Sequence, residues 1–255
     1  MPDNPLDNPL DNPTWHALTG PLAHLAIGHG LARRFQPDVS VFAAIADESA
    51  AAWDDLAAVA GAQEIILNRR GELTLPDDWT FLGGGGGFQM VLNGEPRADV
   101  IDARIRQLTD ADVAAMTELV RLAEPGPWQP RTIALGGYVG IEVGGRLLAM
   151  AGQRVSLHGY TEISAVCTHP DARRRGYAAA VTATVARSIQ EAGNTPILHV
   201  AEHNTRALRL YEQMGFVTRT SLVFSFVKPP LLSGDGTHTA DDRAPAHRSQ
   251  DRRRG

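Results

Sequence analysis

The sequence predicts a globular protein of the α/β (α+β) class, and two observations lead to this class. Apolar residues make up 43% of the 255 residues, an ordinary share for a protein with a buried core. Beyond residue 100, short segments with strand character alternate with segments whose apolar residues recur at helical spacing. At this length the chain has room for one large domain or two modest ones.

Composition excludes several classes of protein. Apolar stretches end well short of the roughly 18 residues that a membrane-spanning helix needs, and residues 1–4 do not resemble a basic signal peptide. We therefore expect a cytoplasmic protein without a membrane partner. Cys167 is the sole cysteine and no Cys and His cluster has zinc spacing, so neither a disulfide nor a metal is expected. A net charge of −5 argues against a nucleic-acid partner.

The first hundred residues are interpreted from local patterns alone. Residues 1–14 repeat Asn-Pro pairs, and because proline disfavours helix in the residue before it, we predict an extended lead-in. Residues 15–35 predict one or two short helices, residues 47–60 a further helix and residues 64–68 a short strand. These elements form a predicted N-terminal lobe over residues 15–96.

Five consecutive glycines occupy residues 83–87. A phosphate-cradling loop is one interpretation, but the Lys-Ser/Thr of a P-loop and a clear following helix are both missing. A flexible connection is the interpretation that we adopt. Residues 93–96, Asn-Gly-Glu-Pro, then predict a turn and the boundary to the rest of the chain.

The second half gives sharper patterns. Thr109 and Asp110 can cap a helix, and the Gly144-Gly145 pair can form a tight hairpin turn. A tail without apolar periodicity follows, for which we expect disorder over residues 229–255. The predicted strands cover residues 100–108, 138–143, 146–154, 160–168, 196–201 and 222–227, and the predicted helices cover residues 111–123, 179–192 and 205–214.

An anion site is predicted where the strand at residues 160–168 leads through three arginines into a helix. Backbone amides 174–179 would lie at the N-terminus of this helix, where unsatisfied N–H groups and the positive dipole end favour a phosphate. Gly176 allows close approach of the backbone and Ala178 leaves the contact unobstructed. The alternative is that Arg173 to Arg175 form a solvated surface and that Gly176 merely turns the chain.

Four consecutive segments resemble the GCN5-related N-acetyltransferase (GNAT) superfamily, within residues 100–228. Residues 161–170 look like its fourth strand, and Arg173-x-x-Gly176-x-Ala178 matches its signature Gln/Arg-x-x-Gly-x-Gly/Ala. Residues 196–204 resemble its fifth strand. The helix and turn that close its site are similar to residues 204–216, where Asn204, Ala207, Leu210, Tyr211, Gly215 and Phe216 stand at matching positions.

The resemblance implies a mixed, mostly antiparallel central sheet with splayed central strands and flanking helices, in a domain at residues 97–228. It implies that the pantetheine arm of acetyl-coenzyme A lies between the strands at residues 160–168 and 196–202. The N-terminal lobe would be a degenerate GNAT-like half, or a family-specific cap that shapes the acceptor pocket. The large side chains that are candidates to line this pocket are Trp15, Trp53, Trp79 and Trp128. The implied cofactor-binding residues are Val166, Cys167, Thr168, Arg173, Arg174, Arg175, Gly176, Tyr177, Ala178, Ala179 and Asn204.

Two residues are candidates for catalysis on the same resemblance. Tyr211 would protonate the departing thiolate, although it could be only a core residue of its helix. Glu162 is the candidate general base, because several family members place an acidic residue there; it could instead be a solvent-facing carboxylate. An acyl-enzyme on Cys167 is a rival hypothesis, but a lone strand cysteine is usually inert. His169, His199 and Glu202 also lie near the presumed cleft, and His199 reads as a core histidine.

The expected activity is transfer of an acetyl group from acetyl-CoA to a primary amine by direct attack. The alternative is a non-catalytic acyl-CoA-binding sensor or regulatory module, and a nucleotide-binding protein that uses the glycine run is third. Acceptor pockets in this superfamily are built from variable loops, so the sequence does not identify the amine. Either a monomer or a homodimer is compatible with the sequence.

Overall fold

The computed structural model describes residues 8–71, 73–97, 102 and 104–230. The predicted extended lead-in before residue 8 and the predicted disordered tail from residue 231 onward lie outside the described residues. Within the described ranges, no helix is long and apolar enough to cross a membrane.

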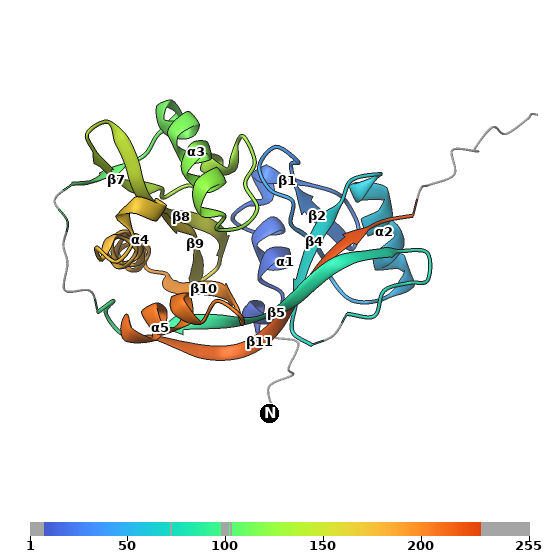
Figure 1. The fold of residues 1–255 in the computed structure, drawn as a ribbon. Coiled ribbons are helices and arrows are strands. Elements are labelled where there is room, and N and C mark those ends of the chain that lie inside the picture. The colour runs from blue at the N-terminus through green and yellow to red at the C-terminus, as the bar shows by residue number, and fades with distance from the viewer. Residues whose placement is uncertain (1–7, 72, 98–101, 103, 231–255) are drawn as a thin grey trace, which may run out of the picture.

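An eight-stranded sheet runs across the molecule in the order β4-β11-β5-β10-β9-β8-β7-β6 (Figure 1). Neighbouring strands are antiparallel except β9 and β10, which are parallel. The mixed, mostly antiparallel sheet expected from the resemblance is therefore confirmed. The strands are β4 (Ile65–Arg69), β5 (Thr80–Leu92), β6 (Ile105–Gln107), β7 (Val139–Val143), β8 (Arg146–Leu157), β9 (Tyr160–Thr168), β10 (Thr195–Ala201) and β11 (Phe216–Lys228).

Helix α4 (Tyr177–Glu191) packs its apolar side on β7, β8, β9 and β10. Val181, Val185 and Ile189, which recur at helical spacing and were predicted to face inward, are at most 1% exposed. α5 (Thr205–Gln213) completes this layer by placing Tyr211 in the same apolar cluster. The predicted helices and the strands between residues 138 and 201 are thus confirmed, while β11 starts earlier than predicted.

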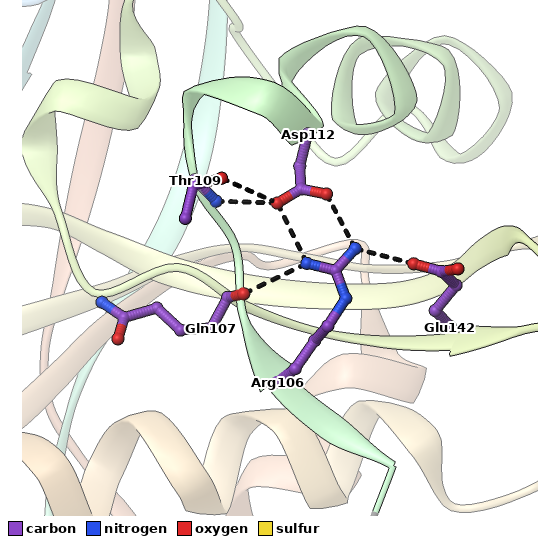
Figure 2. A network of polar contacts seen from close by, with 5 residues as sticks. All are labelled: Arg106, Gln107, Thr109, Asp112 and Glu142. Carbon is purple, nitrogen blue, oxygen red and sulfur yellow. Dashed lines mark hydrogen bonds and ion pairs between the residues drawn. The ribbon is translucent and has the colours of Figure 1, made fainter.

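The N-terminus of α3 (Val113–Ala123) is fixed to the edge of the sheet by polar contacts (Figure 2). Thr109 and Asp112 form a reciprocal capping box around the short 3₁₀ turn Asp110–Asp112. The guanidinium of Arg106, on β6, donates to both carboxylate oxygens of Asp112 at 2.7 and 3.0 Å and to Glu142 of β7 at 2.7 Å. The predicted cap is confirmed for Thr109, whose partner is Asp112 and not Asp110.

The start of the chain differs from the predicted extended segment and helices. Residues 9–14 are not extended: they form a 3₁₀ turn (Pro9–Asp11) and the start of α1 (Pro13–Leu18), because prolines occupy the first turns and the Asn8 side chain caps Leu10 N–H. The rest of α1 falls where a short helix was predicted. Residues 26–35 are not helical, since Gly28 and Gly30 adopt positive φ angles. The elements there are η2 (Ala23–Leu25) and the sheet of β1 (Ala26–Ile27), β2 (Ala32–Phe35) and β3 (Ala43–Ile45), followed by α2 (Ala50–Ala60) as predicted.

The predicted boundary at residue 96 does not divide the molecule into two sheets. β4 and β5 precede this boundary, yet β5 pairs with both β10 and β11 in the middle of the large sheet. Ala17 and Leu18 of α1 belong to the same apolar cluster as Ile197 of β10, whereas the next residue, Leu198, belongs to the cluster under α4. Because successive strand residues face opposite sides, the N-terminal segment covers the face of the sheet opposite α4.

The glycine run is a strand and not a flexible connection, which corrects the prediction. Residues 83–87 pair with residues 222–226 of β11, and Gly87 also pairs with Ala201 of β10. Glycine is required by close contacts: a Cβ on Gly84 would lie 2.2 Å from the carbonyl oxygen of Phe224, and one on Gly87 would lie 2.8 Å from the Phe224 ring. Pairing of the whole run with β11, and of Gly87 with β10 as well, supplies the order that glycine itself disfavours.

Candidate active site

A cleft opens where the two central strands separate. β9 and β10 are paired from Tyr160 with Thr195 to Ile163 with Leu198, and no further β9–β10 pair follows in the described residues. Beyond this point lies a cleft of about 1050 Å³, lined by residues 163–168 of β9 and residues 199–201 of β10. The splayed strands expected from the resemblance are present, and each leaves main-chain groups without a strand neighbour on the cleft side.

A β-bulge changes the direction of the β9 backbone within the cleft. The register with β8 jumps from Met150 opposite Cys167 to Gly152 opposite Ser164, and Ala165 between them has φ of 52°. A non-glycine residue in this region is unusual and marks a backbone held by its surroundings. The bulge puts Val166, Cys167 and Thr168 along the cleft wall, as the prediction required.

The arginine turn places backbone amides at the start of a helix, as the sequence predicted. Arg174 and Gly176 have φ angles of 63° and 77°, and α4 begins at Tyr177. The first helical hydrogen bond is donated by the N–H of Ala180 to the carbonyl of Gly176, at 3.0 Å. The amides of residues 177–179 therefore precede the helical ladder and are oriented toward the open end of the turn.

The three arginines of this turn are not equivalent. Arg173 and Arg174 line the cleft, whereas Arg175 is directed back along the turn and donates to the carbonyl of Asp171 at 3.3 Å. All three are exposed. Two of the three predicted cationic contacts thus lie at the cleft.

Asn204 and Tyr211 lie on the opposite wall, and both line the cleft. Asn204 is the N-cap of α5, where its Oδ1 accepts from the N–H of Ala207 at 3.1 Å. Tyr211 is 8% exposed and its ring packs edge-on against Phe216. Burial raises the pKa of the Tyr211 hydroxyl above its ordinary value, so this group stays protonated at neutral pH.

Cys167 is a buried thiol within an apolar cluster that includes Met116 and Tyr138. Desolvation raises the pKa of the thiol to about 12, although a backbone contact with Met150 acts in the opposite direction. A thiol with this pKa is almost entirely protonated at neutral pH and is a poor nucleophile.

The structure changes the interpretation of Glu162 more than that of any other candidate residue. It is 1% exposed, so the solvent-facing alternative is wrong. The guanidinium of Arg154 forms a two-point contact with its carboxylate, and His199 Nδ1 lies 2.7 Å from its Oε1. Burial disfavours the charged carboxylate, but Arg154 and His199 outweigh this effect and lower the pKa of Glu162 to about 2.

Hydrogen bonds through Gln89 fix the tautomer of His199. Arg219 donates to Gln89 Oε1 at 2.9 Å, and since arginine has no acceptor, the amide group of Gln89 must face the other way. This amide nitrogen donates to the carbonyl of Leu10 at 2.9 Å and lies 3.1 Å from His199 Nε2. His199 Nε2 is therefore an acceptor, its proton is on Nδ1, and the ring is a satisfied core histidine as predicted.

The sequence did not point to three residues of this network, which are Arg154, Gln89 and Arg219. Arg154 could have been found from the sequence, because the predicted hairpin of β8 and β9 brings it close to Glu162, at the bulge that follows the Gln153–Ile163 pair. Gln89 and Arg219 carried none, since their contacts depend on the N-terminal segment, whose placement local patterns do not reveal. Arg219 also pairs with Asp11, at 2.7 Å.

Other candidates lie outside the cleft. His169 does not line it; its Nδ1 accepts from the N–H of Asp171 and its Nε2 lies 2.9 Å from Arg146. Glu202 is exposed beside Gly86. None of the four tryptophans lines the cleft, whose far wall is formed instead by Phe42, Ile66, Phe224 and Phe226. No cluster of three or more metal-ligating side chains is found in the described part of the chain.

Comparison with known proteins identifies relatives of this chain. Residues 138–225 match the family described as FR47-like protein. A solved structure from Novosphingobium aromaticivorans DSM 12444, assigned to the GNAT family of acetyltransferases, is 34% identical and has a TM-score of 0.81. The match covers 88% of this chain and 99% of that one. No curated protein matches the chain.

More distant structures share the fold alone. A GCN5-related N-acetyltransferase from Kribbella flavida is 18% identical, with a TM-score of 0.56 over 82% of this chain and 92% of that one. A Drosophila protein is 17% identical, with a TM-score of 0.57 over 78% of this chain and 74% of that one.

Proposed function

This chain belongs to the GNAT family, and on that premise we propose that it transfers an acetyl group from acetyl-CoA to a primary amine. The observation that carries the proposal is the joint presence, in one cleft, of an anion-binding turn, unpaired strand edges and a protonated tyrosine. An anion-binding turn alone would serve a binding module as well.

The cleft suits a long ligand with phosphates at one end. Amides 177–179, Arg173 and Arg174 would hold the pyrophosphate of coenzyme A. Main-chain groups of Val166 and Thr168 would pair with the amides of the pantetheine arm, completing the strand edge left open by the separation of β9 and β10. The Thr168 hydroxyl is buried without a hydrogen-bond partner in the described residues, so it has a free polar group to offer. Asn204 supports the other wall from the start of α5.

When bound, acetyl-CoA supplies an activated carbonyl carbon on a thiolate leaving group. In the proposed reaction the amine nitrogen forms a bond to this carbon and the carbon–sulfur bond breaks, without an acyl-enzyme on Cys167. The β9 backbone near Val166 would polarise the carbonyl oxygen. Tyr211 would give its proton to the departing sulfur, because its hydroxyl stays protonated and lines the cleft. The proton that the attacking nitrogen loses would return Tyr211 to its protonated form, directly or through water.

The geometry does not favour Glu162 as the base that deprotonates the amine. Its carboxylate is enclosed by Arg154 and His199, and a pKa of about 2 makes it a weak proton acceptor. We assign Glu162 a positioning role instead, in which it holds the Arg154 guanidinium at the cleft wall. The amine would enter as the free base or lose its proton to water.

Release of free coenzyme A thiol from acetyl-CoA tests the proposal. We expect release that depends on an added primary amine and yields the N-acetylated product in equal amount. Saturable binding of acetyl-CoA without transfer to any amine would favour the non-catalytic acyl-CoA-binding module instead.

A further inference from the structure

The cleft continues past the separated strands onto a bare strip of backbone formed by the glycines of β5. Gly84, Gly85 and Gly86 line it there. Gly85 differs from its neighbours, because a Cβ built on it meets no atom within 4 Å and its φ is not positive. A side chain at position 85 would thus be tolerated by the backbone, and it would project into open space. The glycine leaves that space free.

Aromatic and branched side chains surround the strip. Phe224 lies directly opposite Gly85 in the β5–β11 pairing, and Phe226 lies opposite Gly83, so both belong to the face on which Gly85 is bare. Phe42 and Ile66 of the N-terminal region form the other side. Phe226 is 43% exposed, a large apolar side chain left uncovered at the mouth of this chamber. Hereafter the acceptor chamber means the part of the cleft lined by these four residues and Gly84 to Gly86.

The charge of the cleft lining is strongly one-sided. Arg154, Arg173, Arg174, Arg206 and Arg209 line the cleft, whereas Glu124 is the sole acidic side chain in its lining among the described residues. Such a surface attracts the phosphates of coenzyme A, and it repels a ligand with several positive charges.

We propose that the acceptor chamber binds the apolar group of a primary amine that carries no positive charge beyond its amino group. The proposal rests on the proposed function above. Apolar burial against Phe224, Phe226, Phe42 and Ile66 supplies the affinity, and the bare Gly85 supplies the room. Polyamines and other polycations are disfavoured by the arginines.

The same surroundings favour the neutral, nucleophilic form of a bound amine. Burial in apolar surroundings disfavours an ammonium ion and thus lowers the pKa of a bound amine. The amine is then delivered as the free base that can attack the thioester. This explains how the reaction proceeds although the nearest buried carboxylate, Glu162, is occupied by Arg154 and His199.

Calorimetric titration of the full chain, with and without coenzyme A, tests the proposal with three probes: phenethylamine, ethanolamine and spermidine. We expect phenethylamine to bind at least tenfold more tightly than either of the others. The Gly85→Leu variant fills the chamber and should weaken phenethylamine binding at least tenfold, with Gly85→Ala intermediate. The control variant Thr80→Leu places a leucine in the same strand but outside the cleft, and it should leave the affinity for phenethylamine unchanged.

Equal or tighter binding of spermidine or ethanolamine would overturn the proposal, and so would unchanged phenethylamine binding in Gly85→Leu. Coenzyme A affinity of each variant within twofold of the parent shows that the cleft is intact. The Gly85→Ala variant and the parent's own probe preference keep the test decisive if Gly85→Leu does not fold. These readouts are binding constants. Absence of acetyl transfer would therefore refute the proposed function but would leave the proposed binding of an apolar amine untouched.

Discussion

Tyr211 is the single residue on which catalysis is expected to depend. Replacing it by phenylalanine keeps the edge-on packing against Phe216 but removes the proton donor. We expect Tyr211→Phe to lower kcat by about 100-fold, in the range typical of a lost general acid. Acetyl-CoA affinity should remain within twofold, as measured by calorimetry.

The matched control for this substitution is Tyr160→Phe, at the start of β9 and outside the lining of the cleft. Its kcat should equal that of the parent. If Tyr211→Phe turned over as fast as Tyr160→Phe, the assigned role of Tyr211 would be wrong.

Glu162 makes stability depend on pH in a defined window. Its pKa is about 2 in the folded chain against an ordinary value of 4.5, so between these values the unfolded chain binds more protons. The contribution of Glu162 to stability is complete above pH 4.5 and is lost as pH falls toward 2. At pH 7, Glu162→Gln should destabilise the fold by about 3 kcal/mol, since it leaves Arg154, whose side chain is only 16% exposed, without its anionic partner.

Urea unfolding at pH 7, 4.5 and 3 measures this dependence. The free energy of unfolding of the parent should fall more steeply below pH 4.5 than that of Glu162→Gln. Glu191→Gln, an exposed site on α4, is the control. Identical slopes in all three proteins would mean that Glu162 is not the group responsible.

The capping box at α3 is expected to contribute measurably to stability. Asp112→Ala removes both the reciprocal cap with Thr109 and the two-point contact with Arg106 (Figure 2). We expect a loss of about 1–2 kcal/mol, the sum of a typical cap and an exposed ion-pair network. Asp110→Ala, in the same turn but outside this network, should cost less than half as much by chemical denaturation.

Element prediction succeeded where local signals and tertiary contacts agree. The Gly144-Gly145 turn has the positive φ angles that its residues favour, and the apolar spacing of α4 matches its buried side. The glycine strand was missed because its order comes from pairing with β11, and at Gly87 also with β10, not from its own residues. The arginine turn and Tyr211 were foreseen from motif order, whereas Gln89 and Phe42 reach the site only through long-range packing.

At the scale of the whole chain, the two halves depend on each other. β5 lies between β10 and β11, and its Met90 and Leu92 belong to the cluster beneath α4. A fragment of residues 97–228 would lack this strand and expose both of its neighbours. We expect this fragment to show no cooperative thermal transition and no binding of acetyl-CoA, as measured by calorimetry. Cooperative unfolding of the fragment would contradict this interdependence.

The N-terminal segment also completes the site. Leu10 and Asp11 hold Gln89 and Arg219 on the sheet face opposite α4, and Phe42 and Ile66 form a wall of the acceptor chamber. It therefore covers one face of the sheet.

Titration of the full chain with acetyl-CoA decides whether the separated strands and the arginine turn form a coenzyme A site. We expect saturable one-to-one binding that weakens severalfold in Arg174→Ala and falls with added salt, because charge-assisted phosphate contacts contribute to it. Absence of saturable binding by the folded parent chain would contradict the assignment of the cleft, and with it the proposed acetyl transfer.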